Sequence, residues 1–173
     1  MDNSIYSAQH YLSKGQATIQ PELAAYVLGG AGGNESLNAN LCAWQNWALC
    51  PKQISDCRSV STQADLLGSS WSSPIAVAPM ARQKAVHPSG ELAMAQAARA
   101  AGVGFACAMG SSTPWREVAS MEGTAWFQIT LQVDRADTLK AVRLAEDVGF
   151  EVLMVTVDSG VQQAAWQALA LGF

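Results

Sequence analysis

Basic residues are scarce in this sequence. Only 10 of its 173 residues are Lys or Arg, against 14 Asp or Glu, which gives a formal net charge of −4. The basic residues are scattered and form no run. Because a nucleic-acid-binding surface needs clustered Lys and Arg side chains to neutralise phosphates, the composition argues against a nucleic-acid partner.

Long hydrophobic runs are missing as well. The sequence has no stretch of about 18 uncharged apolar residues, the length that a membrane-spanning helix needs. Its opening residues, MDNSIYSAQHYL, contain neither the basic region nor the apolar core of a signal peptide. We therefore expect a cytoplasmic protein.

Metal-binding patterns are also lacking. The sequence has 4 Cys and 2 His residues. The cysteines form no Cys-x-x-Cys pair, and His10 and His87 are not spaced to share a metal ion. We expect no metal site, and reduced thiols in the core or on the surface.

The sequence does contain enough apolar material for a packed core, since 50% of its residues are hydrophobic and 14% are charged. Residues 1–70 are expected to form a mostly helical N-terminal segment, with helices over 3–14, from Pro21 onward, and over 35–49. The run GGAGG at 29–33 ends the second helix, because successive glycines favour positive φ and break a helix.

From residue 74 onward, short apolar strands alternate with helices. The expected strands cover 74–79, 103–108, 125–129 and 152–158, and the expected helices cover 89–102, 112–120 and 134–149. Ser89 and Thr113 are the expected N-caps of the first two helices. The last helix is expected to turn one face inward: Leu139, Val142, Ala145 and Val148.

This alternation predicts βα units around a parallel sheet that is buried on both faces. Four such units in about 85 residues fit either an open doubly wound sheet or half of a (β/α)8 barrel. The residues after the first strand, PMAR at 79–82, contain no glycine-rich phosphate-binding pattern, which counts against a dinucleotide site. Residues 71–173 are thus expected to form the α/β part of the chain.

In either architecture, function lies at the carboxyl ends of the strands. Polar residues occur there at Gln128, Thr130, Thr156 and Asp158. An isolated polar residue at a strand end also often caps a helix or forms a turn. From the residues alone, both interpretations stay open.

Four segments of the chain resemble one protein family, in the same order and at consistent spacing. PIAVAPMARQKAVHPSGELAMAQAARAAG (74–102) resembles its first βα unit, with a Pro-x-Ala turn followed by His-Pro-x-Gly-Glu. WFQITLQVDR (126–135), VTVDSG (155–160) and AYVLGGAGGNESL (25–37) resemble its Phe-Gln-Leu-Tyr, Thr-Val-Asp and N-terminal Tyr-Tyr segments. The family is that of the FMN-dependent 2-hydroxy acid oxidases and dehydrogenases, which includes glycolate oxidase, lactate oxidase and mandelate dehydrogenase.

The resemblance implies a fold and a reaction. The fold would be α/β, the first half (about four βα units) of a (β/α)8 TIM barrel preceded by N-terminal helices. The reaction would be oxidation of a small L-2-hydroxy acid to a 2-oxo acid, with FMN passing the electrons to oxygen, a quinone or another acceptor. Neither the particular hydroxy acid nor the acceptor follows from the sequence.

The resemblance also implies contacts with the flavin. Pro79, Met80 and Ala81 match the loop whose backbone approaches the flavin ring. Gln128 matches a side chain that hydrogen-bonds the pyrimidine edge of the ring, and Thr156 matches another ring contact.

Other positions match family residues near the substrate or differ from them. Tyr26 matches a tyrosine whose hydroxyl binds the substrate carboxylate, and Asp158 matches the acid that pairs with the catalytic histidine. Thr130 stands where the family has a substrate-contacting tyrosine, and Ala108 stands where a serine commonly binds the flavin. His87 is interpreted as a buried loop residue that satisfies backbone groups.

Further departures weaken the site. Gly110, Gly160 and Ala165 stand where the family commonly has an aromatic residue, a proline and an arginine. The family's catalytic histidine, its arginine and its phosphate-binding groups match no position of this sequence. We therefore expect an incomplete chain that is inactive by itself. The alternative is a non-catalytic half-barrel that binds flavin weakly, or that assembles with a second copy or a complementary chain.

Overall fold

The computed structural model describes residues 5–123, 126–158 and 164–172. The chain forms two compact units, Met1–Ser55 with Gly160–Phe173, and Asp56–Ser159. The boundaries between the two units thus fall after Ser55 and Ser159. From the sequence, the boundary between the N-terminal segment and the α/β part is predicted after residue 70. None of the helices in the described part of the chain is long and apolar enough to cross a membrane.

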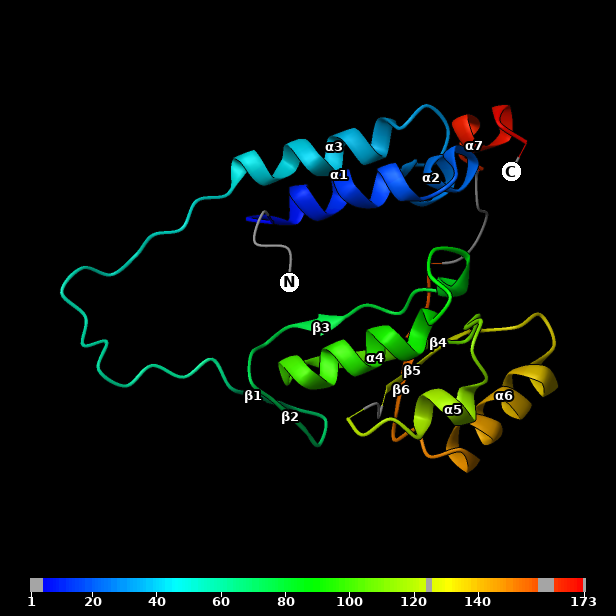
Figure 1. The fold of residues 1–173 in the computed structure, drawn as a ribbon. Coiled ribbons are helices and arrows are strands. Elements are labelled where there is room, and N and C mark those ends of the chain that lie inside the picture. The colour runs from blue at the N-terminus through cyan, green and yellow to red at the C-terminus, as the bar shows by residue number, and fades with distance from the viewer. Residues whose placement is uncertain (1–4, 124–125, 159–163, 173) are drawn as a thin grey trace. The chain divides into compact units, whose positions relative to one another are not determined.

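The first unit is helical. It contains α1 (Ala8–Thr18), α2 (Pro21–Leu28), α3 (Glu35–Ala43), the 3-10 turn η1 (Trp44–Asn46) and α7 (Trp166–Ala170). Ser7 caps α1 by accepting the His10 N–H at 3.3 Å, and Pro21 occupies the first position of α2, as predicted. The helix α7 packs against α2 (Figure 1).

Regular helix ends at Asn46, so the expectation of a mostly helical segment to residue 70 is wrong beyond that point. Residues 47–63 form neither helix nor strand. The strands β1 (Ala64–Leu66) and β2 (Ser69–Trp71) then pair as an antiparallel hairpin. The apolar spacing over 35–49 does not extend the helix because α3 buries none of its residues, and helices depend mainly on a packed face.

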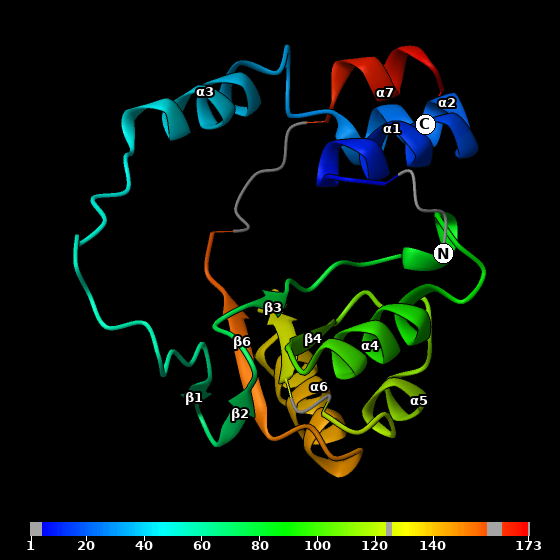
Figure 2. The ribbon, with the colours of Figure 1, turned by 60° about the vertical axis from the view of Figure 1, so that its left-hand side comes forward.

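The second unit contains a four-stranded parallel sheet in the order β3-β4-β5-β6. Its strands are β3 (Ala76–Val77), β4 (Gly104–Ala108), β5 (Trp126–Thr130) and β6 (Val152–Thr156). The connecting helices are η2 (Gln83–Ala85), α4 (Gly90–Ala101), α5 (Trp115–Ala119) and α6 (Arg135–Asp147). Figures 1 and 2 show α4, α5 and α6 on one side of the sheet. This confirms the predicted βα succession.

The core of this unit lies between the sheet and those helices. All residues of β4 are buried, while β5 alternates, with Phe127 and Ile129 buried toward the helices. No residue of β6 is buried, and Leu153 is 42% exposed. The prediction of a sheet buried on both faces is therefore wrong at β6, because β6 is an edge strand with a neighbour on one side only.

Two predicted helix starts are corrected, and the predicted inward face of α6 is confirmed for Ala145, Val142 and Val148, which pack on the core, but not for Leu139. Ser89 already has helical backbone angles and makes no capping hydrogen bond. Thr113 precedes Pro114, and its hydroxyl donates to Glu91 instead of capping α5. On α6 the buried face contains Ala141 and Ala145.

Leu139 is 44% exposed rather than inward. It lies about 160° around α6 from Ala141, which puts it away from the face that packs on the sheet. Gly102 ends α4 with a φ of 65°, as predicted.

Candidate functional site

Polar side chains from β5 and β6 meet at the carboxyl ends of these strands. The Gln128 Nε2 donates to the Thr156 Oγ1 at 2.7 Å and to the Thr130 Oγ1 at 3.0 Å. Thr130 and Thr156 face each other in the strand register. Because side chains alternate along a strand, all three lie on the face opposite Phe127 and Ile129. The structure thus brings together three residues that the sequence predicts as site residues.

The end of β4 is joined to this cluster. The Met109 N–H donates to the Gln128 backbone oxygen at 2.9 Å and also lies 3.3 Å from the Gln128 Oε1. Ala108, the residue before it, is buried. Gln128 therefore connects the ends of β4, β5 and β6. Its side-chain oxygen accepts from Met109 and its side-chain nitrogen donates to Thr130 and Thr156.

The loop after β3 approaches the loop after β4. The Arg82 N–H donates to the Gly110 oxygen at 3.2 Å. A Cβ added to Gly110 would lie 3.0 Å from the Ala81 Cβ, so the glycine permits this close approach. Pro79 and Met80 precede Ala81 in the same loop, and the Met80 side chain is exposed. This places the predicted flavin-facing loop next to the end of β4.

Four other positions singled out in the sequence are not joined to this cluster by a hydrogen bond in the described residues, belong to the other compact unit, or lie outside the described residues. Asp158 follows β6 by two residues and is exposed. Tyr26 lies on α2 in the other compact unit and is 49% exposed. Ala165 precedes α7 in that same unit, and Gly160 lies outside the described residues. The roles of Asp158 and Tyr26 stay predictions.

His87 satisfies a backbone group, although it is not buried. Its Nδ1 accepts the Ser89 N–H at 3.2 Å. The side chain is exposed because the loop lies on the surface, so the expectation of burial is wrong. His87 is therefore engaged in the turn that leads into α4.

Glu91 is a buried charged residue behind the candidate site, and the sequence alone assigns it no role. It is fully buried. Burial by itself would raise its pKa, but hydrogen bonds from Ser112, its own backbone and Thr113 outweigh this effect and lower the pKa to about 2. The signal in the sequence is the glutamate of HPSGE, a motif that carries the family resemblance but does not by itself indicate a role for the side chain.

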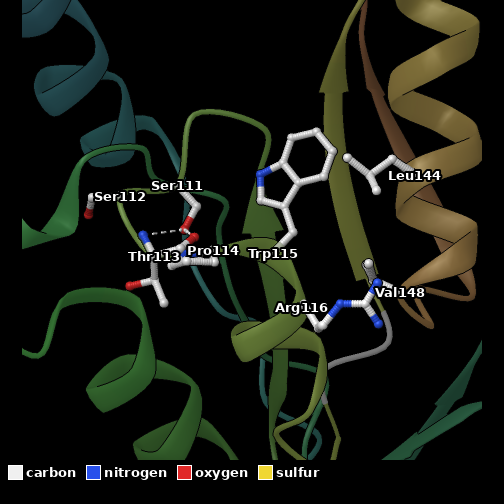
Figure 3. Close-up of a pocket in the computed structure, with 8 residues that line it drawn as sticks. All are labelled: Ser111, Ser112, Thr113, Pro114, Trp115, Arg116, Leu144 and Val148. Atoms are coloured by element: carbon white, nitrogen blue, oxygen red, sulfur yellow. Dashed lines mark hydrogen bonds between the residues drawn. The ribbon is translucent and has the colours of Figure 1, made fainter.

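A separate hollow of about 420 Å³ lies on the helix side of the sheet (Figure 3). It is lined by residues 111–116, Leu144 and Val148. The Trp115 ring in this hollow meets the Phe127 ring edge-on at 4.6 Å between centroids. Phe127 is on the face opposite Gln128, so this hollow is not part of the cluster at the strand ends.

The described residues contain no group of three His, Cys, Asp or Glu side chains placed to hold a metal ion. The Gln128 cluster instead offers neutral amide and hydroxyl groups, each of which can donate and accept hydrogen bonds. Ala108 lies opposite Gln128 in the strand register, and the small residues Ala81 and Gly110 approach each other in the loops after β3 and β4. This arrangement fits the flat ring of FMN, whose polar edge has both donors and acceptors.

The fold and the cluster define a partial (β/α) barrel with a polar site at the carboxyl ends of its strands. The sequence model described as FMN-dependent dehydrogenase matches residues 15–173. L-lactate oxidase from Alicycliphilus denitrificans is 37% identical over 150 residues, which cover 86% of this chain and 41% of that protein. 4-hydroxymandelate oxidase from Amycolatopsis orientalis is 40% identical over 137 residues, covering 79% of this chain and 38% of that protein.

A solved structure of mandelate oxidase superposes with a TM-score of 0.92 at 35% identity, covering 98% of this chain and 50% of that chain. The chain therefore belongs to the FMN-dependent dehydrogenase family, whose cofactor is FMN. It spans about two fifths of the length of the curated relatives and half of the solved structure.

Proposed function

We propose that this chain supplies the flavin-ring half of an FMN-dependent 2-hydroxy acid oxidoreductase, which converts a small L-2-hydroxy acid to a 2-oxo acid. The observation that carries the proposal is the hydrogen bond between Gln128 and Thr156 at the carboxyl ends of β5 and β6. Both residues match family positions that contact the flavin ring. Their side chains lie on the face that the helices leave uncovered.

In this proposal Gln128 and Thr156 hold the polar edge of the ring. The backbone of Pro79, Met80 and Ala81 approaches the ring from the neighbouring loop, and the backbone of Ala108 limits the other side. FMN, when bound, supplies the chemistry of accepting two electrons from the substrate carbon. The role of this half of the protein is to orient the ring.

Substrate and proton handling involve three further residues. The Tyr26 hydroxyl would bind the substrate carboxylate, while Thr130 is too short to reach the point that a tyrosine hydroxyl would occupy. Asp158 would orient an imidazole and stabilise its protonated form. Neither histidine of this sequence matches the family's base: His10 lies in α1, and His87 accepts the Ser89 amide. We therefore expect no turnover by the 173-residue chain alone.

The experiment is an FMN titration of the purified chain, followed by its visible spectrum and by flavin fluorescence. We expect saturable binding that Gln128→Ala weakens about tenfold, the effect of losing one well-placed hydrogen-bonding group. The control is Gln132→Ala, which removes an exposed amide whose Nε2 donates to the Thr130 backbone oxygen at 2.8 Å. Assays with lactate, glycolate and mandelate accompany the titration.

Two results would contradict the proposal. Equal losses in Gln128→Ala and Gln132→Ala would remove Gln128 from the flavin site. Turnover of any of the three acids by this chain alone would show that it is a complete enzyme.

The second candidate function is a non-catalytic half-barrel that assembles with another chain. The observation that favours it is the exposed apolar side of β6, where Leu153 and Val155 are 42% and 46% exposed. Absence of FMN binding, together with self-association or capture of a complementary half-barrel, would support this candidate over the first.

A further inference from the structure

Glu91 lies in the first turn of α4 and accepts hydrogen bonds from two separate loops. Its Oε1 accepts the Gln83 N–H at 3.1 Å and the Ser112 N–H at 2.8 Å. The Ser112 hydroxyl lies 2.8 Å and 2.9 Å from the two carboxylate oxygens, and the Thr113 hydroxyl donates to Oε2 at 2.8 Å. Both carboxylate oxygens are thus saturated with donors.

The donors come from the loops that follow β3 and β4. Gln83 lies two residues after Ala81, and Ser112 lies two residues after Gly110. The Lys84 N–H also donates to the Ser112 hydroxyl at 2.9 Å, which joins the loops directly. The carboxylate therefore lies immediately behind the backbone segments that face the flavin in the proposed function.

A buried carboxylate is stable only while its hydrogen bonds are made, because removing donors leaves an uncompensated charge away from the solvent-exposed surface. Among the described residues, the donors to Glu91 are neutral backbone amides and hydroxyls. If either loop moved away from Glu91, the carboxylate would lose part of its hydrogen bonds and the charge would become unfavourable for the other loop as well. The two loops are therefore coupled through one side chain.

We propose that Glu91 is a positioning residue that holds the loops after β3 and β4 in the arrangement in which their backbones meet the flavin ring. This inference rests on the proposed function. Glu91 itself does not touch the ring, since it is buried behind Gln83 and Ser112. It acts by fixing where Ala81 and Gly110 lie.

The test combines amide hydrogen exchange with FMN titration on the 173-residue chain. The variants are Glu91→Ala, which removes both acceptors, and Glu91→Gln, which keeps one oxygen for the two amides. The matched control is Val118→Ala, a fully buried core residue of α5 whose truncation lowers stability without removing a loop hydrogen bond. Exchange at the Gln83 and Ser112 amides is compared with exchange at β5, which reports global opening.

We expect Glu91→Ala to raise exchange at Gln83 and Ser112 about tenfold more than at β5, and to weaken FMN binding about tenfold or more. Glu91→Gln is expected to recover most of both losses, and Val118→Ala to raise exchange evenly with little change in FMN affinity. If Glu91→Ala does not fold, Ser112→Ala takes its place. That variant removes one hydroxyl group that bonds to Glu91. It is expected to raise loop exchange and to weaken FMN binding by a smaller factor than Glu91→Ala.

The inference is overturned if loop exchange in the Glu91 or Ser112 variants rises no more than exchange at β5. It is also overturned if loop exchange rises selectively while FMN affinity falls no more than in Val118→Ala. If the wild-type chain takes up no FMN, the proposed function fails. In that case the comparison of amide exchange at Gln83 and Ser112 with exchange at β5 still tests whether Glu91 couples the two loops.

Discussion

Glu91 keeps its charge inside the protein with the help of neutral donors. Burial disfavours the charged form, while the hydrogen bonds from Ser112 and Thr113 favour it, and the second effect is larger. Proton uptake by Glu91 would break this balance, since a protonated carboxyl group cannot accept at every position. The ionisation of one residue is therefore linked to the folding of the unit that contains the sheet.

The direction of this linkage gives a pH-dependent stability. The pKa of Glu91 is lowered from 4.5 to about 2 on folding, so the stabilisation is fully present above pH 4.5 and is lost as the pH falls toward 2. A shift of this size corresponds to about 3 kcal/mol. We expect the free energy of unfolding, measured by urea titration between pH 7 and pH 2, to fall by an amount of this order.

Glu91→Gln is the control for this measurement, because it cannot ionise. Its unfolding free energy should be lower than that of the wild type at pH 7, and its dependence on pH below 4.5 should be shallower. Parallel pH profiles for the two proteins would assign the acid sensitivity to other carboxylates.

At the scale of elements, most of the predicted strands and helices follow from local signals, and the exceptions are places where tertiary contacts decided. The pattern of apolar runs predicted four strands, and the predicted helix end at residue 102 is correct. The helix predicted over 134–149 is capped by Asp134, which accepts the Ala136 N–H at 2.7 Å, although no cap is predicted there from the sequence. Thr113 failed as a cap because a distant partner, Glu91, took its hydroxyl. A contact between residues 22 positions apart has no local signature.

The site was predictable to the extent that it depends on strand ends. The strand pattern placed Gln128, Thr130 and Thr156 at strand ends, the family resemblance supplied their expected roles, and the register of β5 and β6 brings them together. The role of Glu91 was not predictable in this way. It depends on two loops folding back onto the start of α4.

The hairpin of β1 and β2 packs on the amino-terminal ends of β4 and β5 through Trp71. The rings of Trp71 and Trp126 lie 5.2 Å apart, and the Trp126 Nε1 donates to the Ser69 Oγ at 3.2 Å. A Cβ added to Gly104 would lie 2.4 Å from Trp71 Cζ2. Gly104 therefore lets the indole cover the start of β4.

We expect Gly104→Ala to lower the free energy of unfolding by about 1–3 kcal/mol, the usual penalty of overpacking. Gly15→Ala is the matched control, because the added methyl group of this helical glycine meets nothing within 4 Å. It should leave stability unchanged or raise it by up to about 1 kcal/mol. Chemical denaturation followed by tryptophan fluorescence measures both. A Gly104→Ala protein as stable as the wild type would show that the hairpin is not held against the sheet.

At the scale of the whole molecule, the feature with the clearest consequence for association is the edge of the sheet at β6. Among the strands of the described residues, in the order β3-β4-β5-β6, β3 and β6 each have one neighbour. β3 is only two residues long, whereas β6 has five residues. The exposed side chains of β6, Leu153 and Val155, are apolar and form what we call its outer side. An edge strand with these properties favours pairing with another chain. The solved structure of mandelate oxidase is matched over 50% of its length, so a full-length relative has further chain beyond the matched part.

This edge predicts concentration-dependent self-association of the 173-residue chain. Val155→Lys places a charge on the outer side of β6 and is expected to raise the concentration at which the chain associates by about tenfold or more. Leu144→Lys on α6 is the matched control, because Leu144 and Val155 are both 46% exposed and only Val155 lies on the edge strand. Sedimentation velocity over a range of protein concentrations measures the effect. A wild-type chain that stays monomeric throughout, or equal shifts in the two variants, would show that the edge of β6 does not drive association.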